Sequence, residues 1–261
     1  MALLVPGVGL GEESALRELS NGDDGKGWTA VGRINLGTKG FCTGTLIAPD
    51  LVLTAAHCLF DKDTGALVPA DDMEFLAGWR NGRADAYRMV RRAVAHPDYV
   101  FETRDRIDRV AYDLALLELD SPIRLNNILP FETGARPQMG EEVSVVSYAK
   151  DRSEAPSLQQ VCHVLGQKTG VLVLSCEVDF GSSGAPVFSI RDGSVRIVSV
   201  VSAKADVDDK PVALGTDLTV PLAELRRFLD SEDGVLHGPK QVAGHAAATG
   251  LRNTGAKFLK P

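Results

Sequence analysis

Apolar and polar residues alternate over many short stretches of the chain, and Gly, Pro, Asn or Asp separates each stretch from the next. Alternation with a period of two residues is typical of β-strands that are buried on one face. The first set of stretches is WTAVGRINLG, FCTGTLIA, LVLTAAH, MEFLAGW, YRMVRRAVAH and DLALLEL. The second set is EEVSVVSYA, QQVCHVLGQ, GVLVLSCEV, APVFSI, SVRIVSVVSA and PVALGTDLT. No helical pattern lies between these strands, so we expect an all-β protein built as a barrel or sandwich.

A break in the strand pattern at Ser121–Asn127 indicates a linker between two barrels. We therefore expect a first barrel over residues 28–125 and a second over 126–230. The second unit ends in a helix, because Leu222, Leu225 and Leu229 recur at helical spacing after Pro221.

Both ends of the chain have weaker patterns. We expect residues 1–27 to form a weakly structured lead, in which Glu13–Leu19 could make two turns of helix, and residues 231–261 to form a tail. The start, MALLVPGVGL, has no basic residue and is interrupted by proline and glycine, so it is a poor signal peptide.

The formal net charge is −7 and the pI is about 5.3, which argues against nucleic acid as the main partner. No apolar run reaches 18 residues, so no membrane-spanning helix is expected. The acidic residues Asp71, Asp72 and Glu74 could suggest a calcium loop, but their spacing does not match an EF-hand, and a solvated turn is favoured.

The four cysteines form two local pairs along the sequence, Cys42 with Cys58 and Cys162 with Cys176. A zinc site is the alternative, but there is no CxxC and the spacing does not fit a zinc finger. Two disulfides are therefore favoured, each closing a loop of about 15 residues and worth about 3 kcal/mol. Disulfides indicate an oxidising compartment, so we expect a periplasmic or secreted protein.

Three segments carry candidate chemistry, each where a strand meets a loop: TAAHC with His57, AYDLALLEL with Asp113, and GSSGAP with Ser183. A serine hydroxyl is a poor nucleophile until an imidazole accepts its proton and a carboxylate orients that imidazole. Gly181 would permit a turn that aims the backbone amides of Gly181 and Ser183 at a developing oxyanion.

These three segments, in this order, resemble the signature segments of the trypsin-like (chymotrypsin-fold) serine peptidases. HPDY ahead of Asp113 and IVSVVS after Ser183 add to the resemblance, which covers about residues 28–230. The resemblance implies two six-stranded antiparallel barrels with the site between them, a C-terminal helix, and a disulfide between Cys42 and Cys58. It also implies a serine endopeptidase that cleaves polypeptides as a monomer, with neither cofactor nor metal.

The segment GSSGAP departs from the usual family pattern G-D-S-G-G-P, because Ser182 stands where the family has aspartate. In many animal members that aspartate pairs with a new amino terminus released by cleavage, and a neutral hydroxyl cannot form that ion pair. We therefore expect a preformed site, as in bacterial members of the family. Glu177 lies where the family places the base of its primary specificity pocket, and a carboxylate there would favour Lys or Arg substrates. Ser202 and Lys204, two residues after it, could line the same pocket, and Lys204 could either neutralise Glu177 or itself favour acidic side chains. Cleavage after basic residues is therefore one expectation, and the acidic preference is its alternative.

Two other functions fit parts of the sequence. Because Ser182 replaces the aspartate, the chain could be a catalytically silent peptidase fold that only binds. GSSGA also approaches the elbow of an α/β-hydrolase, but that fold needs a helix after the serine, and APVFSI reads as a strand. Of the remaining histidines, His96 resembles a framework residue of the family, and the others are expected at the surface, namely His163, His237 and His245.

Overall fold

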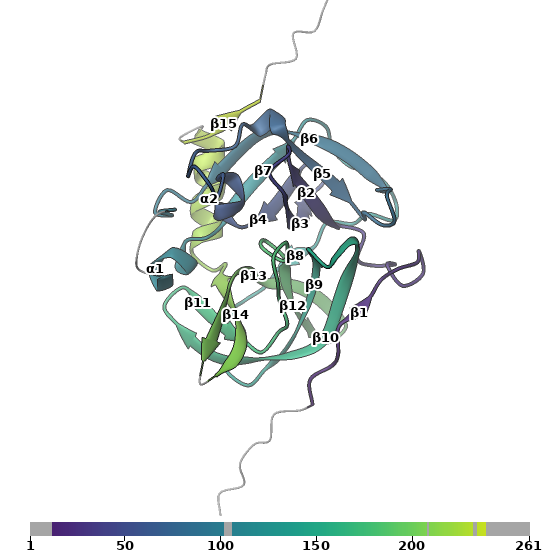
Figure 1. Ribbon diagram of the computed structural model, residues 1–261, viewed down its shortest axis with the longest axis vertical. Coiled ribbons are helices and arrows are strands. Elements are labelled where there is room, and N and C mark those ends of the chain that lie inside the picture. The colour runs from purple at the N-terminus through teal and green to yellow at the C-terminus, as the bar shows by residue number, and fades with distance from the viewer. Residues whose placement is uncertain (1–11, 102–105, 208, 232–233, 239–261) are drawn as a thin grey trace, which may run out of the picture.

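Two closed rings of antiparallel strands make up the protein (Figure 1). The computed structural model describes residues 12–101, 106–207, 209–231 and 234–238. The first ring runs in the order β6-β5-β2-β3-β4-β7, and pairing of β6 with β7 closes it. Its strands are β2 (Val31–Leu36), β3 (Phe41–Ala48), β4 (Leu51–Thr54), β5 (Met73–Ala77), β6 (Ala86–Ala95) and β7 (Ala115–Leu119).

The second ring runs in the order β10-β11-β14-β13-β12-β9 and closes through β9 and β10. Its strands are β9 (Glu142–Ala149), β10 (Arg152–Lys168), β11 (Val171–Leu174), β12 (Pro186–Arg191), β13 (Ser194–Val207) and β14 (Lys210–Asp217). Short strands join both sheets: β1 (Arg17–Glu18) on β10, β8 (Glu132–Thr133) on β13 and β15 (Leu236–His237) on β6. The predicted all-β fold of two six-stranded antiparallel barrels is confirmed. The expected boundary at residues 125 and 126 lies between β7 and β8.

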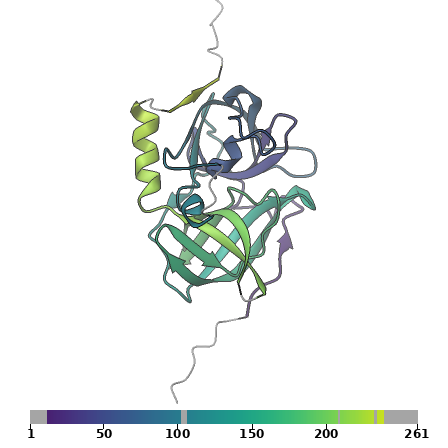
Figure 2. The same cartoon turned by 60° about the vertical axis from the view of Figure 1, so that its left-hand side comes forward.

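Helix α2 (Pro221–Ser231) follows the second barrel and lies beside the first (Figure 2). The predicted face of Leu222, Leu225 and Leu229 is buried. His96, at the end of β6, is buried and bonds through Nε2 to Glu224 of the helix at 2.9 Å. The C-terminal helix therefore holds the two barrels together. The other helical segments are short: η1 (Ala56–Leu59), η2 (Ala70–Asp72) and α1 (Arg106–Ala111).

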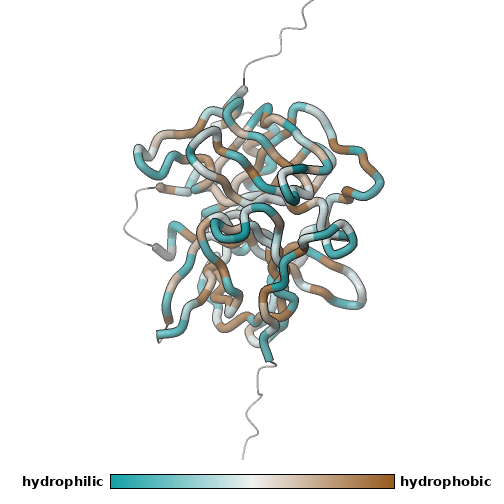
Figure 3. The backbone as a smooth tube through the Cα atoms, turned by 45° about the vertical axis from the view of Figure 1, so that its right-hand side comes forward, coloured by the Kyte–Doolittle hydropathy of each residue, from teal (hydrophilic) through white to brown (hydrophobic). Residues whose placement is uncertain are grey.

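Hydrophobic and hydrophilic positions alternate over short distances in both halves of the molecule (Figure 3). The inward positions of the second barrel form a core of mainly valine, leucine and alanine around the Cys162–Cys176 disulfide. Between the barrels, the rings of Trp28 and Phe131 pack on Phe188 of β12 at centroid distances of 5.1 and 4.7 Å. This aromatic cluster adds apolar contact where the two barrels meet.

The segment Glu13–Leu19 is not helical, contrary to the sequence-based expectation. Arg17 and Glu18 form β1, which pairs with Leu158 and Ser157 of β10, and Leu19 is completely buried. Hydrogen bonding to an open strand edge outweighs the helix propensity of this short segment. The lead is thus ordered over its described part. Residues 1–11, and residues 239–261 of the expected tail, lie outside the described residues.

All four cysteines are paired, Cys42 with Cys58 and Cys162 with Cys176, so the two expected disulfides form and the zinc alternative is wrong. Among the described residues, no helix is long and apolar enough to cross a membrane. His163 is buried rather than at the surface as expected, whereas His237 is exposed. His245 lies outside the described residues.

Candidate active site

His57 lies in the 3-10 turn η1, directly after β4. The next residue, Cys58, is bonded to Cys42 of β3 with a Cα–Cα distance of 6.3 Å. The disulfide therefore fixes the histidine turn to the neighbouring strand. The side chain of His57 is 21% exposed, so the imidazole reaches the surface while the backbone of the residue is held in the fold.

Asp113 is buried between α1 and β7, and it holds His57 at two points. One carboxylate oxygen, Oδ2, is 2.7 Å from His57 Nδ1, and Oδ1 accepts the backbone N–H of His57 at 2.8 Å. The hydroxyl of Ser202, on β13 of the second barrel, also donates to Oδ2. A carboxylate only accepts hydrogen bonds, so Nδ1 carries the hydrogen and Nε2 is left as the acceptor.

Ser183 lies in the loop before β12, and two contacts with the first barrel place it next to the histidine turn. The N–H of Thr43 donates to the carbonyl of Ser183 at 2.8 Å. Gly184, with φ +78°, packs so closely that a Cβ would overlap Thr54 Oγ1 and lie 3.0 Å from Ala55 N. These residues immediately precede His57, so the serine loop rests on the strand that leads to the imidazole.

No hydrogen bond joins the Ser183 hydroxyl to His57 among the described residues. Catalytic hydrogen bonds are often long in the absence of substrate and shorten in the substrate complex. The structure thus brings His57 and Asp113 into direct contact and carries Ser183 to the same edge of the first barrel.

The backbone amides of Gly181 and Ser183 have no acceptor in the described part of the chain, whereas the amides of Ser182 and Gly184 each have one. The N–H of Ser182 donates to Asp179 O and that of Gly184 to Val201 O, both at 2.8 Å. Gly181 has φ +96°, and a Cβ there would overlap the ring of Phe41. Two neighbouring free amides beside a serine are the arrangement that binds an oxyanion.

Ser182 is completely buried, and its hydroxyl is surrounded by polar partners. Its Oγ is 3.2 Å from Ser147 Oγ and 3.2 Å from Tyr148 O. The N–H of Asp179 donates to the same oxygen at 3.3 Å. Arg152 Nη2 donates to it at 3.5 Å, while Nη1 bonds to the carbonyl and hydroxyl of Ser147 at 3.0 and 3.1 Å.

Arg152 was not found from the sequence, because its contacts are with residues that are up to 30 positions away. Its side chain is only 13% exposed. Burial lowers the pKa of the guanidinium, and the negative charges of Asp151, Asp179 and Glu177 act in the opposite direction. A mostly buried cation thus lies beside Ser182, under the loop that precedes the serine.

In the described part of the chain, no hydrogen bond or ion pair joins the three residues expected to form the specificity pocket. Ser202 is buried and bonds to Asp113. Glu177 and Lys204 are exposed, and the N–H of Glu177 donates to Gln159 Oε1 at 2.7 Å. Their part in substrate selection stays a prediction.

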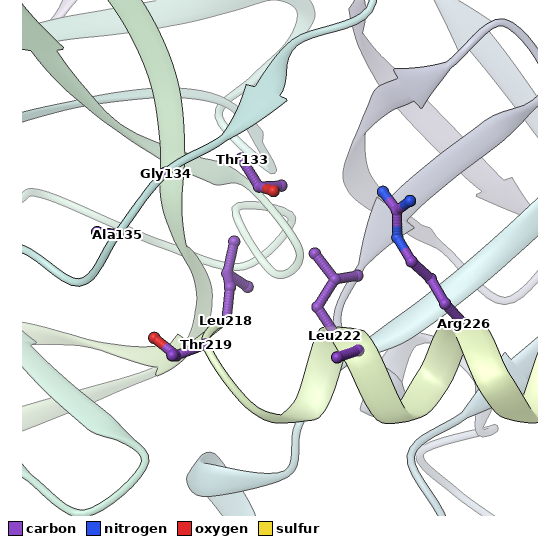
Figure 4. Close-up of a pocket in the computed structure, with 8 residues that line it drawn as sticks. Thr133, Gly134, Ala135, Leu218, Thr219, Leu222 and Arg226 are labelled. Atoms are coloured by element: carbon purple, nitrogen blue, oxygen red, sulfur yellow. The ribbon is translucent and has the colours of Figure 1, made fainter.

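A surface pocket beside the start of α2 is distinct from this site (Figure 4). Thr133, Leu218 and Leu222 point toward one another there, and Arg226 lies on the next turn of the helix. None of the residues that line it belongs to the three candidate segments, so this pocket is separate from the candidate active site.

A family model described as a trypsin-like peptidase domain matches residues 42–196. Since this is more than half of the chain, the protein belongs to the trypsin-like peptidase family. A trypsin from Simulium vittatum is 31% identical over 194 residues, which cover 62% of this chain and 69% of that protein.

Two further relatives match over shorter parts of their length. A glutamyl endopeptidase from Bacillus licheniformis is 26% identical over 150 residues, which cover 57% of this chain and 45% of that protein. A modular serine protease from Drosophila melanogaster is 34% identical over 90 residues, which cover 34% of this chain and 14% of that protein. This chain thus spans less than half of either relative.

A solved structure of a Glu endopeptidase in complex with MPD has the same fold. It superposes with a TM-score of 0.68, covering 85% of this chain and 99% of that chain at 17% sequence identity.

Proposed function

We propose that this chain is a serine endopeptidase with the catalytic triad Ser183, His57 and Asp113. Ser183 Oγ attacks the scissile carbonyl, and His57 Nε2 accepts its proton. The amides of Gly181 and Ser183 bind the oxyanion. His57 then gives the proton to the leaving amine as the C–N bond breaks, and water releases the acyl group by the reverse sequence. The double hydrogen bond between His57 and Asp113 is the observation that carries this proposal.

Hydrolysis of an unfolded polypeptide tests this proposal. We expect Ser183→Ala to lower kcat by at least about 10³-fold, because the nucleophile is removed. Ser189→Ala is the matched control, since Ser189 is a buried serine on the following strand. Equal hydrolysis by the two variants would contradict the proposal.

We infer further that the site does not depend on insertion of a new amino terminus. The hydroxyl of Ser182 is already engaged by Ser147, Tyr148 and Arg152, and it has no charge with which to bind an ammonium group. Cleavage just before Trp28 should therefore not raise the activity. A large rise in activity, with the new terminus buried, would contradict this inference.

Glu177 supports a preference for basic residues at the cleavage site, since an exposed carboxylate six residues before the nucleophile attracts Lys and Arg side chains. A peptide library gives the test, with Glu177→Gln compared with Lys204→Gln. We expect cleavage after Lys and Arg to fall about tenfold in the first variant only, for loss of one charge interaction. Dominant cleavage after acidic or apolar residues would rule out the basic preference, and cleavage after Glu would agree with the specificity named for the glutamyl endopeptidase.

The alternative function is a catalytically silent binding protein on the same fold. It differs from the proposed function in predicting no turnover and no covalent reaction of Ser183. The two free amides next to Ser183 favour the enzyme, since they leave the oxyanion site open.

The two disulfides support a location in an oxidising compartment, either secreted or periplasmic. The proposed partner is a polypeptide substrate, handled by a monomer.

A further inference from the structure

Gln159, on β10, is completely buried, and its side-chain amide joins two distant parts of the chain. Its Nε2 donates to the carbonyl of Ser14 at 3.1 Å, and its Oε1 accepts the backbone N–H of Glu177 at 2.7 Å. The amide is therefore the physical link between the lead of the chain and the start of the loop that ends at the nucleophile.

The N-terminal segment, residues 14–19, is firmly attached on its side of this link. The N–H of Ser14 donates to Val161 O at 3.0 Å, and the N–H of Val161 donates to Ser14 Oγ at 2.8 Å. Further along, β1 pairs with β10, and Leu19 is completely buried. The carbonyl of Ser14 is thus a fixed acceptor.

A fixed acceptor at Ser14 determines how the Gln159 amide is oriented. A glutamine side chain has an NH₂ donor at one end and an oxygen acceptor at the other. Since the Ser14 carbonyl can only accept, the NH₂ group must face it. The oxygen then faces Glu177, whose N–H can only donate. Without Ser14, the NH₂ group loses its acceptor, and the N–H of Glu177 alone then orients the amide.

The oxyanion loop, residues 177–182, is attached at both of its ends. Gln159 holds the N–H of Glu177 at the start. Ser182 is held at the end by Ser147 and Tyr148. In between, the N–H of Lys150 donates to Phe180 O at 2.7 Å. The position of Gly181, and so of its free amide, depends on both attachments.

We propose that Gln159 is a positioning residue for the oxyanion loop, and that the N-terminal segment is a working part of the active site because it orients this amide. The inference rests on the proposed function. It assigns to the lead a role opposite to that of a segment whose removal activates the enzyme: displacement of residues 14–19 lowers the reactivity of Ser183.

The experiment uses four full-chain variants in two matched pairs. Gln159→Met removes both hydrogen bonds at similar volume, and Gln160→Met makes the same change at the exposed neighbour on β10. Ser14→Pro removes the N–H and hydroxyl that hold the segment, and Glu12→Pro places the same residue two positions earlier. For each variant one measures the rate of Ser183 phosphonylation by a fluorophosphonate, kcat and KM on one peptide substrate, and the melting temperature.

We expect phosphonylation and kcat to fall about five- to tenfold in Gln159→Met and Ser14→Pro with KM unchanged, since the hydrogen bond from Gln159 to the loop is removed in the first variant and is less firmly oriented in the second. The two control variants should stay within about twofold of wild type, because they touch no bond to the loop. The double variant Gln159→Met/Ser14→Pro should lose no more than either single variant, since both act through one amide.

Wild-type phosphonylation rates in Gln159→Met, even with a lower melting temperature, would reduce Gln159 to a structural residue and overturn the inference. If Gln159→Met does not fold, equal rates in Ser14→Pro and Glu12→Pro would overturn it. A wild-type chain that does not react at all would instead overturn the proposed function, and this inference with it.

Discussion

Ser182 stands where many animal members of the family have the aspartate that pairs with a new amino terminus, and here the guanidinium of Arg152 lies beside its hydroxyl. Arg152 reaches the loop from β10 and binds both Ser182 and Ser147. Because Arg152 belongs to β10, its guanidinium reaches Ser182 without any cleavage of the chain. The positive charge is therefore present as soon as the chain folds.

Arg152→Met should lower kcat/KM by about tenfold, because the hydroxyl of Ser182, at the end of the loop, loses its charged donor. Arg196→Met is the control, since Arg196 is half exposed and its ion pair is with the exposed Glu132. Steady-state kinetics on one peptide substrate measures kcat/KM for both variants. Equal values for the two variants would show that Arg152 does not support the loop.

Gly184 illustrates how closely the serine loop approaches the first barrel. Gly184→Ala should lower the free energy of unfolding by about 2–5 kcal/mol, since it combines left-handed backbone strain with overlap of Thr54 and Thr43. Gly193 has a similar φ of +75° but open space around it, so Gly193→Ala isolates the strain and should cost only about 1 kcal/mol. Denaturant unfolding measures both, and equal losses would contradict the close approach.

Among single residues, the sequence predicted candidates that lie in local motifs. It missed residues whose contacts are with residues far away in the chain. His57, Asp113 and Ser183 each lie in a recognisable segment next to a strand end. Arg152 and Gln159 lie at ordinary positions of a long strand, and only the folded register brings them beneath residues 177–182. Their partners depend on the closing of the second barrel, which no local pattern encodes.

Among the elements, the turn that carries His57 depends on the disulfide between Cys42 and Cys58. A matched comparison removes each disulfide in turn, with Cys→Ala at both of its positions. Either removal should cost about 3 kcal/mol of stability, because the closed loops have similar lengths of 16 and 14 residues. The loss of activity should differ, since only the first disulfide holds the histidine turn.

We expect kcat of the folded enzyme to fall about tenfold or more without the Cys42–Cys58 bond, as misplacement of a catalytic group by about 1 Å can cost 10²-fold. It should change little without Cys162–Cys176. Kinetics at a temperature where both variants are folded makes the comparison. Equal kcat values would contradict the role assigned to the first disulfide.

Most of the elements could be predicted, because an alternating pattern specifies a strand wherever one face is buried. The segment Glu13–Leu19 is the exception. Its residues suit a helix in isolation, but the edge of β10 supplies backbone partners that a lone short helix lacks. A partner strand more than a hundred residues away is not visible in a local pattern.

The whole molecule contains two buried tyrosines whose ionisation is coupled to folding. Burial raises the pKa of Tyr148 well above its usual range, and it raises that of Tyr99 in the same direction, with a further contribution from the negative charge of Asp113. Above a pH of about 10 the unfolded chain loses these protons while the folded chain keeps them. The contribution of these two tyrosines to the free energy of unfolding is therefore fully present below that pH and is lost as the pH rises beyond it.

We expect the free energy of unfolding to fall above pH 10 by about 1.4 kcal/mol per pH unit for each buried tyrosine. Tyr148→Phe should remove its share of this slope, because phenylalanine has no proton to lose. Urea unfolding between pH 9 and 11.5 gives the slope. A free energy that is the same at pH 9 and 11.5 would contradict the burial of these phenols.

The proposed nucleophilicity of Ser183 depends on the way in which the two barrels meet. Its most direct test is the position of a covalent fluorophosphonate adduct, determined by mass spectrometry of the intact and digested wild-type protein. We predict one adduct per chain, at Ser183, which is absent from Ser183→Ala and retained in Ser189→Ala. An unmodified wild-type chain, or an adduct at Ser182 or any other residue, would contradict the account.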